Sequence, residues 1–326
     1  MRTEGKILDL SFKKFFDLGI VISASFPALG SGSGPIIERS DYVLDTGLFN
    51  VLETPYRNTE QEFVGLQQYL GRRGMRTIYL APSAIQERKL DQNSLDETER
   101  KKAVEALKGF VERAYFLRAE KLMICSGPDP GPSDREKAKR QLIKSLNELL
   151  EWTHQLKTDY LLELILENFD RELQKKRLLG PTNESVELIM EVKKNFGNIN
   201  LILDQSHLRQ LGEDHRDSLF LAKNCLGHVH LANCLLKDRS HPQWGDGHPA
   251  FNMEGGELGT SDIVHMLDTL FEIGYLKKEP TGKLPTLSLE VKPSPPNSDP
   301  YATFKDTCNT FLEAWGRFKS RVSFED

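Results

Sequence analysis

The chain has 326 residues, of which 38% are hydrophobic and 28% are charged, and its formal net charge is −5. This composition is typical of a globular protein and excludes a fibrous repeat or a chain disordered throughout. The acidic balance argues against an extended nucleic-acid surface, which needs an excess of Lys and Arg. No stretch approaches the roughly 18 consecutive apolar residues of a membrane span.

The four cysteines are dispersed and form no C-x-x-C pair. Cys125 and Cys225 lie in or beside apolar segments, where Cys serves as a small hydrophobic residue. The N-terminal segment is too charged to match a secretory signal. We therefore expect a reduced, cytoplasmic compartment and no membrane association.

Short apolar runs rich in β-branched residues recur eight times along the chain, and each is followed by a turn and a helical pattern. Most of them are nearly continuously apolar, as expected of parallel strands that are covered on both faces. We predict strands at Gly19–Ser25, Phe49–Glu53, Thr77–Ala81, Lys121–Cys125, Tyr160–Glu167, Asn200–Asp204, Gly227–Ala232 and Pro285–Val291.

The segments between these runs are predicted to be helices. Two of them open with Ser-x-x-Glu, at Ser94 and Ser133, a pattern typical of the capping box that begins a helix. The predicted helices are Pro35–Asp45, Thr59–Gly71, Ser94–Leu117, Ser133–His154, Glu184–Phe196, Asp214–Asn224, Ser261–Ile273 and Tyr301–Phe318.

This alternation of strand and helix predicts the fold class. Eight β/α units in about 290 residues suit a single (β/α)8 TIM barrel, an α/β fold, and we expect one domain over residues 1–326. A dinucleotide-binding fold finds no support, because the Gly-rich loop at Gly30–Gly34 does not match G-x-G-x-x-G at the start of a helix.

The last four predicted strands end in ionisable residues, and in a TIM barrel these strand ends meet at the catalytic mouth. Each residue follows a largely apolar run, so its charge lies at the edge of the core, where it is costly unless paired or coordinated. Three carboxylates at one mouth repel one another, and a divalent cation removes that repulsion. We therefore predict a metal site formed by Glu167, Asp204, His230 and Glu290.

The ligand types indicate which ions this site prefers. Three carboxylates and one imidazole, with positions open for water or substrate, suit Mn²⁺, Co²⁺, Mg²⁺ or Zn²⁺. The set contains no thiolate and so does not resemble a closed structural zinc site. We expect a divalent metal ion as the cofactor, with Mn²⁺ favoured.

Histidines gather in the same part of the chain, with six of the eight between His207 and His248. His207, His230, His241 and His248 all map to loops or strand ends on one face of the predicted barrel. His228 lies two residues before His230 on the same strand and therefore points to the same side. We expect His228 in the barrel interior or behind the ligand.

Between Tyr160 and Pro293 the chain resembles the sugar phosphate isomerase/epimerase superfamily, the xylose-isomerase-like TIM barrels. The runs L-E-N-F-D, D-Q-S-H, G-H-V-H-L-A-N and L-E-V look like the four ligand strands of the family, in order and in the fifth to eighth positions. The resemblance implies that Glu167, Asp204, His230 and Glu290, called the quartet below, bind the metal. It also implies that Glu167 and Glu290 act as the acid/base pair that moves a proton.

The resemblance bears on substrate binding as well, because His207 matches a family position that contacts a substrate oxygen. Ketose 3-epimerases carry an Arg six residues after the ligand His, where this chain has Leu236. They also carry a Gly-Glu-X-Asn-like run where this chain has Leu-Ala-Asn233-Cys, and Asn233 is kept as a substrate-binding candidate. These departures set the chain apart from the ketohexose epimerases.

The seventh loop, residues 241–258, is long and rich in Gly and Pro. His241 and His248, together with Trp244 and Asp246, could line a pocket larger than a free monosaccharide needs. Alternatively, the loop simply folds on itself.

Two further residues are candidates for substrate contacts. Glu53 ends the second strand and could reach a substrate hydroxyl or pair with Arg57. Lys176 belongs to the charged run at 170–177, which is typical of a solvated loop. Alternatively, Lys176 or Arg171 contacts an anionic or polyol substrate.

The predicted function is a divalent-metal-dependent isomerase or epimerase that moves a proton on a sugar or sugar derivative through an enediolate. The alternative is a lyase on the same barrel, either a dehydratase or an enzyme of keto-glycoside β-elimination. An apurinic endonuclease would need a basic DNA-binding face, and a non-catalytic binding protein would not need all four ligands. We expect a small carbohydrate as the partner and no nucleic acid, and a homo-oligomer is left open.

Overall fold

Eight parallel strands close into a barrel in which each strand pairs with its neighbours in the sequence. The computed structural model describes residues 9–277 and 282–322. Hydrogen bonds between the first and last strands complete the ring, which confirms the predicted (β/α)8 barrel. The strands are β1 (Asp17–Val21), β2 (Val51–Pro55), β3 (Arg76–Leu80), β4 (Lys121–Cys125), β5 (Glu163–Glu167), β6 (Ile199–Asp204), β7 (Leu226–Leu231) and β8 (Thr286–Leu289).

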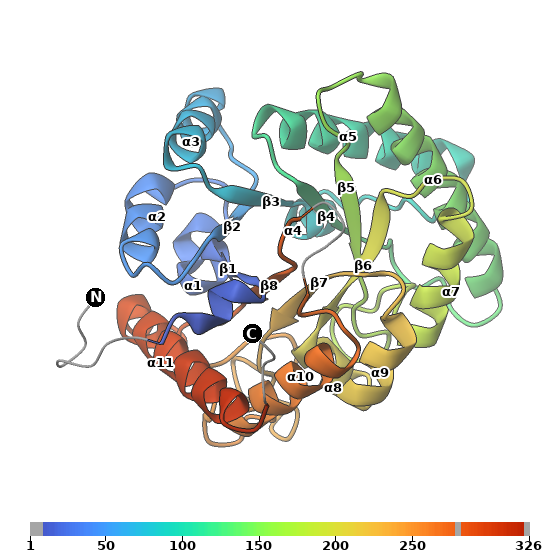
Figure 1. The fold of residues 1–326 in the computed structure, drawn as a ribbon. Helices are drawn as coiled ribbons and strands as arrows, with labels where there is room; N and C mark the ends of the chain where they lie inside the picture. Colours follow the sequence, from blue (N-terminus) through green and yellow to red (C-terminus); the bar gives the residue numbers. More distant parts are fainter. Residues whose placement is uncertain (1–8, 278–281, 323–326) are drawn as a thin grey trace.

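Helices surround the ring of strands (Figure 1). Short helices follow β1, β3 and β6 directly and were not predicted. The helices are α1 (Ile22–Ser25), α2 (Ile36–Leu44), α3 (Glu60–Arg73), α4 (Pro82–Glu87), α5 (Glu97–Phe116), α6 (Arg135–Gln155), α7 (Thr182–Val192), α8 (Gln205–Gln210), α9 (His215–Ala222), α10 (Thr260–Glu272) and α11 (Pro300–Lys319), with 3-10 helices η1 (Ser11–Lys14) and η2 (Pro27–Leu29).

Several predicted boundaries are wrong, and three of them have a clear local reason or cap. β1 ends at Val21, because the apolar residues after it form the helical turn α1 instead of continuing the strand. The N-cap of α5 is Asp96 rather than Ser94, since the Asp96 carboxylate accepts hydrogen bonds from the first backbone N–H groups of the helix. The N-cap of α6 is Asp134 rather than Ser133.

Alternate residues of each strand point into the barrel. One largely apolar layer of the interior contains Val51, Ile78, Met123, Ile165 and Ile202, and the buried His228 of β7 lies in register with Ile202. Because the side-chain period of a strand is two residues, the residue two positions further on points inward one layer closer to the C-terminal end. In β2, β5 and β6 that residue is acidic: Glu53, Glu167 and Asp204. The apolar layer is therefore the floor beneath a polar one.

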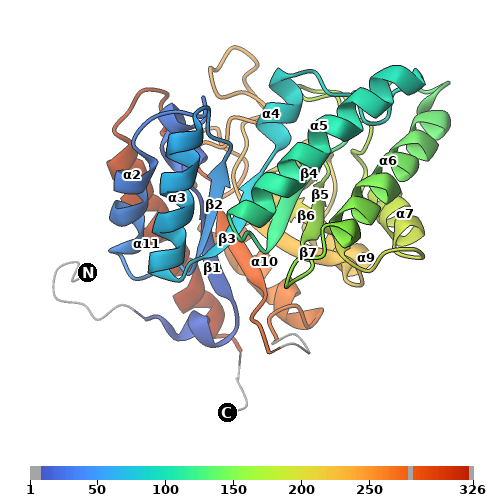
Figure 2. The same ribbon diagram turned by 90° about the horizontal axis from the view of Figure 1, so that it is seen from above.

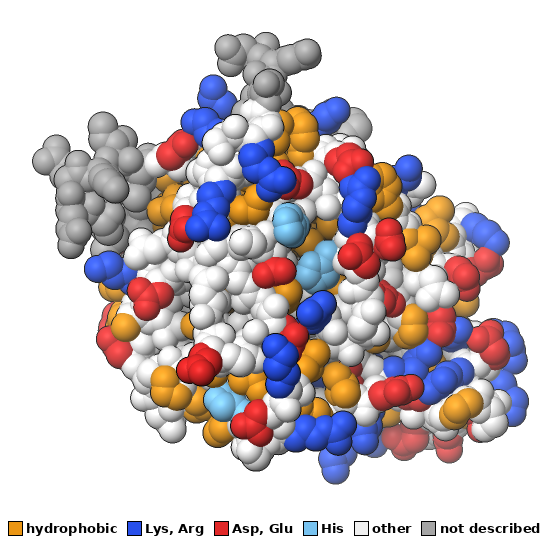
Figure 3. Space-filling view, turned by 90° about the horizontal axis from the view of Figure 1, so that it is seen from below, with side chains coloured by type: hydrophobic (Ala, Val, Ile, Leu, Met, Phe, Trp, Pro, Cys, Tyr) orange, Lys and Arg blue, Asp and Glu red, His pale blue; other side chains and the backbone are white. Residues whose placement is uncertain are grey.

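The loops that follow β7 and β8 lie on the same side of the barrel (Figure 2). On the face that carries α10 and α11, the described acidic and basic side chains are interspersed rather than gathered into one basic area (Figure 3). Within residues 9–277 and 282–322, no helix has the length and apolar content to cross a membrane.

An aromatic cluster joins the beginning of the described chain to the last helix. Trp315 of α11 is fully buried. Its ring lies edge-on to Phe12 and Phe16, at centroid distances of 6.1 and 5.9 Å. Its indole N–H donates to the hydroxyl of Ser11 at 3.0 Å. Since η1 precedes β1 and α11 follows β8, the cluster supports the pairing that closes the barrel.

We expect Trp315→Ala to lower the free energy of unfolding by about 3–5 kcal/mol, because it removes a large buried ring and leaves a cavity. Urea denaturation followed by circular dichroism measures the change. Leu221→Ala is the control, since Leu221 is 48% exposed on α9 and should shift stability by no more than about 0.5 kcal/mol. Equal midpoints for both variants would contradict a role of the cluster in closure.

Candidate functional site

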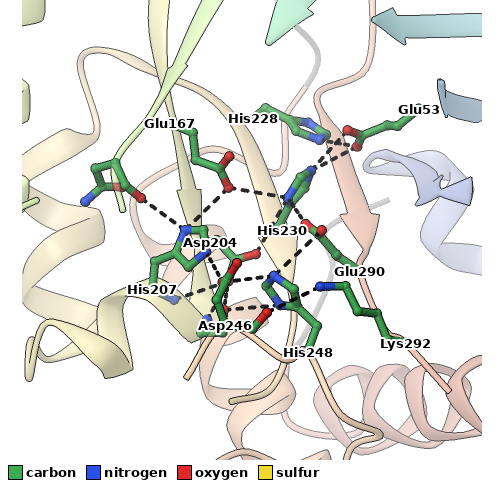
Figure 4. A network of polar contacts seen from close by, with 12 residues as sticks. Glu53, Glu167, Asp204, His207, His228, His230, Asp246, His248, Glu290 and Lys292 are labelled. Carbon is green, nitrogen blue, oxygen red and sulfur yellow. Dashed lines mark hydrogen bonds and ion pairs between the residues drawn. The ribbon is translucent and has the colours of Figure 1, made fainter. Parts of the chain in front are cut away.

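The four predicted ligands come from four consecutive strands. Glu167 ends β5, Asp204 ends β6, His230 lies in β7 and Glu290 directly follows β8. One side-chain atom from each lies within 4.8 Å of the chosen atom of every other. Figure 4 shows these side chains turned toward one another. The structure therefore brings the whole predicted quartet together.

The strand register explains this convergence. Asp204 pairs with His230 across β6 and β7, so both side chains lie at the same height in the barrel. His230 pairs with Ser288 across β7 and β8, and Glu290 lies two residues beyond Ser288 on the same side of the chain. Glu167 pairs with the residue two before Asp204. Because every second residue of a strand points inward, this register places all four side chains near the C-terminal end of the barrel.

Three potential ligand atoms of the quartet are buried without a hydrogen-bond partner: Glu167 Oε2, Asp204 Oδ2 and His230 Nδ1. The other oxygen of Asp204 caps α8, where it accepts from the backbone N–H of Ser206 at 2.6 Å. Nδ1 of His230 lies 2.8 Å from Glu290 Oε2 and 3.6 Å from Asp204 Oδ2. Leaving such atoms unpaired is costly, so they indicate a site shaped for a ligand.

A further carboxylate, Glu53 of β2, orients His230 from behind. Nε2 of His230 lies 3.1 Å from both Glu53 oxygens, and Nε2 of His228 lies 2.8 Å from one of them. Burial lowers the pKa of His228 to about 4, so this imidazole is neutral. With its Nε2–H donated to Glu53, His230 turns the Nδ1 lone pair toward the quartet, as metal-binding histidines do.

The electrostatics of the quartet show an excess of negative charge. Burial raises the pKa of Glu167 to about 8, and the carboxylates of Glu290 and Asp204 add to the shift. Burial also disfavours the charged form of His230, but Glu53, Asp204 and Glu290 outweigh it and raise the pKa of His230 well above its usual range. The quartet thus retains protons that a bound cation would displace.

These residues fit a divalent cation, with oxygen and imidazole ligands and no thiolate. Two other groups of potential ligands share residues with the quartet: Glu53, His228 and His230, and Asp204, His207 and His248. In the first group, two imidazole N–H groups already donate to Glu53. In the second, both ring nitrogens of His207 have protein partners. The quartet is the group with unpaired ligand atoms from three strands.

The quartet borders a cavity of about 240 Å³ at the mouth of the barrel. Glu167, His230 and Glu290 line it, and Pro27 and Phe169 contribute apolar surface. A few convergent polar groups within a partly apolar wall are typical of a small-molecule site.

The loop after β7 completes this cavity with Asp246 and His248. Gly247 between them is required, because a Cβ there would lie 2.1 Å from the backbone oxygen of Gln243. His241 stays within its own turn, where its Nδ1 accepts from the backbone N–H of Gln243 at 3.1 Å. Both predicted alternatives therefore apply to loop 241–258, which folds on itself and also reaches the cavity.

His207 lines the cavity but already has two protein partners. Its Nδ1 lies 3.0 Å from the backbone oxygen of Asn168, and its Nε2 lies 2.7 Å from Asp246 Oδ1. Burial opposes its charge, yet Asp204 and Asp246 raise the pKa of His207 to about 10. In this arrangement the imidazolium ties loop 241–258 to the barrel.

Three other candidate substrate-binding residues lie away from the cavity. Glu53 is fully buried behind His230, and the alternative pairing with Arg57 is wrong, because Arg57 binds Glu62 at 3.1 Å. Asn233 shapes loop 241–258, since its Oδ1 accepts from the backbone N–H of Leu258 at 2.7 Å. Lys176 is exposed and does not line the cavity.

Two charged cavity residues were missed by sequence reasoning, Lys175 and Lys292. Lys292 carried a usable signal, because it lies two residues beyond Glu290 and so on the same side of the extended chain. Lys175 carried none, because the choice between it and Lys176 depends on the loop conformation, in which Lys176 has a φ of 50°.

Comparisons with known proteins agree with this architecture. A family model described as xylose isomerase-like TIM barrel matches residues 43–300, whereas no curated protein sequence matches the chain. An L-ribulose 3-epimerase structure superposes with a TM-score of 0.70 at 17% identity, covering 95% of this chain and 99% of its own.

Two other solved structures are similarly close. D-allulose 3-epimerase from Methylomonas sp., in complex with D-allulose, has a TM-score of 0.65 at 18% identity and covers 95% and 98% of the two chains. The IolI protein with a bound zinc atom has a TM-score of 0.67 at 14% identity and covers 93% and 99%. At these identities the likeness establishes the fold.

We expect Glu53→Gln to weaken divalent-metal binding by about 10- to 100-fold, because the carboxylate that orients His230 is lost. Titration of the metal-free protein with Mn²⁺ or Zn²⁺ against a chelating indicator measures the affinity. Glu62→Gln is the matched control, since this carboxylate binds Arg57 outside the cavity. An unchanged affinity in Glu53→Gln would remove its orienting role.

Proposed function

Because this chain belongs to the xylose isomerase-like TIM barrel family of enzymes, we propose that it is an isomerase or epimerase that moves a proton on a sugar or sugar derivative. The observation that carries the proposal is the buried quartet beside a closed-ended cavity, with Glu167 and Glu290 both on the cavity wall. The 3-epimerase activities of similar folds support the same reaction class.

The metal that this function requires would be held by Glu167, Asp204, His230 and Glu290. When bound, a divalent cation supplies Lewis-acid polarisation of the substrate's carbonyl and hydroxyl oxygens. Mn²⁺ is the favoured ion, because the ligand set consists of hard oxygens with one imidazole. The unpaired Glu167, Asp204 and His230 atoms support this assignment.

The proton transfer itself falls to Glu167 and Glu290. One carboxylate takes the proton from the carbon beside the carbonyl; the C–H electron pair forms the C=C bond and the carbonyl π pair moves onto oxygen, which gives an enediolate. The other carboxylate returns a proton, either to the neighbouring carbon or to the opposite face of the same carbon. Glu167 ends β5 and Glu290 follows β8, so the two residues come from strands that are not neighbours in the barrel.

A lyase is the second candidate, and one observation favours it. A further cavity adjoins the first and shares Pro27, Lys175, Asp246 and Lys292 with it. This space could accept a leaving group at the β carbon after the same proton abstraction. Product analysis separates the two functions, since an enone product indicates the lyase.

We expect the wild-type protein to exchange a carbon-bound hydrogen of a keto-sugar for deuterium in deuterated water, with no new unsaturation. Glu290→Gln should slow this exchange by roughly 10²–10⁴-fold, because an amide neither removes nor returns a proton. Nuclear magnetic resonance follows the exchange, and thermal unfolding checks the fold. Glu254→Gln, an exposed position in loop 241–258, is the control. Near-wild-type exchange in Glu290→Gln would contradict the acid/base role of Glu290.

Removal of the metal should abolish activity without unfolding the barrel, whose core is independent of the quartet. Exhaustive chelation followed by dialysis tests this, and Mn²⁺ should restore turnover. Asp204→Asn should not be restored at the same Mn²⁺ concentration, because one ligand charge is lost. Full turnover in protein that metal analysis shows to be ion-free would exclude a metal-dependent reaction.

A further inference from the structure

Two lysines lie where the quartet cavity meets the outer cavity. Lys175, in the loop after β5, and Lys292, after β8, line both the inner space of about 240 Å³ and the outer space of about 520 Å³. Trp244 and Pro293 form part of the outer wall. A ligand that extends from the quartet into the outer cavity therefore passes both ammonium groups.

The charge of Lys175 is balanced within the protein. Its Nζ lies 2.9 Å from Oδ2 of Asp246, a buried carboxylate that also contacts His207 at 2.7 Å. This pairing holds loop 241–258 against the loop after β5. Lys175 is consequently a part of the cavity wall rather than an unused charge.

Lys292 differs, because its charge has no counter-ion among the described residues. Its Nζ donates to the backbone oxygen of Asp246 at 3.3 Å, which uses one of its three N–H groups. The side chain is half-buried, and Figure 4 shows it on the same side of the network as Glu290. A partly desolvated ammonium with unused donors is a favourable partner for an anion.

We propose that Lys292 binds an anionic group of the substrate, a phosphate or a carboxylate, where the two cavities meet. The inference rests on the proposed function and deepens it, since it names the substrate as an anionic sugar derivative. The polyol part of that substrate lies in the inner cavity beside the quartet. The anionic group lies at Lys292, and any larger substituent extends along Trp244 in the outer cavity.

Binding of unreactive polyols to the Mn²⁺-loaded protein tests the proposal without turnover. Isothermal titration compares sorbitol, sorbitol 6-phosphate and gluconate, which share a polyol chain and lack a ketone. We expect at least one anion to bind at least about tenfold more tightly than sorbitol. A charged hydrogen bond of ordinary strength is worth about 10- to 100-fold in affinity. The phosphate and the carboxylate arms identify which anion is preferred.

The variants assign the effect to the lysine. Lys292→Gln should remove the preference for the anion and leave sorbitol binding unchanged, whereas Lys292→Arg should keep most of it. Lys237→Gln is the matched control, because Lys237 lies in the loop after β7 with a 74% exposed side chain. The proposal is overturned if the wild-type protein binds sorbitol and both anions with equal affinity, or binds none of them. It is also overturned if Lys292→Gln weakens the binding of all three ligands equally.

The outcome is separable from that of the proposed function. If the wild-type protein catalyses deuterium exchange but Lys292→Gln binds anions as tightly as the wild type, only the anion site is overturned. Anion binding that depends on Lys292 in a protein that exchanges no keto-sugar hydrogen overturns the isomerase alone.

Discussion

The structure depends on the cost of gathering three carboxylates at one buried place. Glu167, Asp204 and Glu290 lie with His230 within a sphere of a few ångströms, and burial there disfavours the charged form of each carboxylate. The barrel can hold them because an apolar cluster of Val51, Ile78, Met123, Ile165 and Ile202 packs beneath them. The apolar core thus stabilises the fold, and the quartet does not have to.

The residues around the quartet follow from this constraint. Glu53 accepts hydrogen bonds from His228 and His230, so the imidazole that faces the three carboxylates has a defined orientation. Asp204 uses one oxygen to cap α8 and keeps the other for the quartet. Asp204 and His230 therefore each have one structural contact that positions the side chain and one atom that has no hydrogen-bond partner. Such preorganisation is what a metal site and a proton-transfer site both need.

Loop 241–258 adds a second, more distant set of contacts. Asp246 contacts His207, His248 and Lys175, and so connects loop 241–258 to helix α8 and to the loop after β5. Asn233 organises the far end of the same loop through backbone N–H groups. These contacts give the cavity its wall and place Lys292 at its opening. The strand ends therefore supply the quartet, whereas the loops supply much of the remaining cavity wall.

The sequence by itself determined the eight strands, the parallel barrel and the quartet, because these depend on local patterns: apolar runs, an inward period of two, and an ionisable residue at or near the end of each of the last four strands. It also indicated His248 and Asp246 as cavity residues. Only the tertiary structure decided that Glu53 pairs with two histidines rather than Arg57, and that Asn233 and His241 serve the loop. It likewise brought Lys175, rather than Lys176, to the mouth, because the direction of a loop side chain is set by backbone angles and by contacts between residues far apart in the chain.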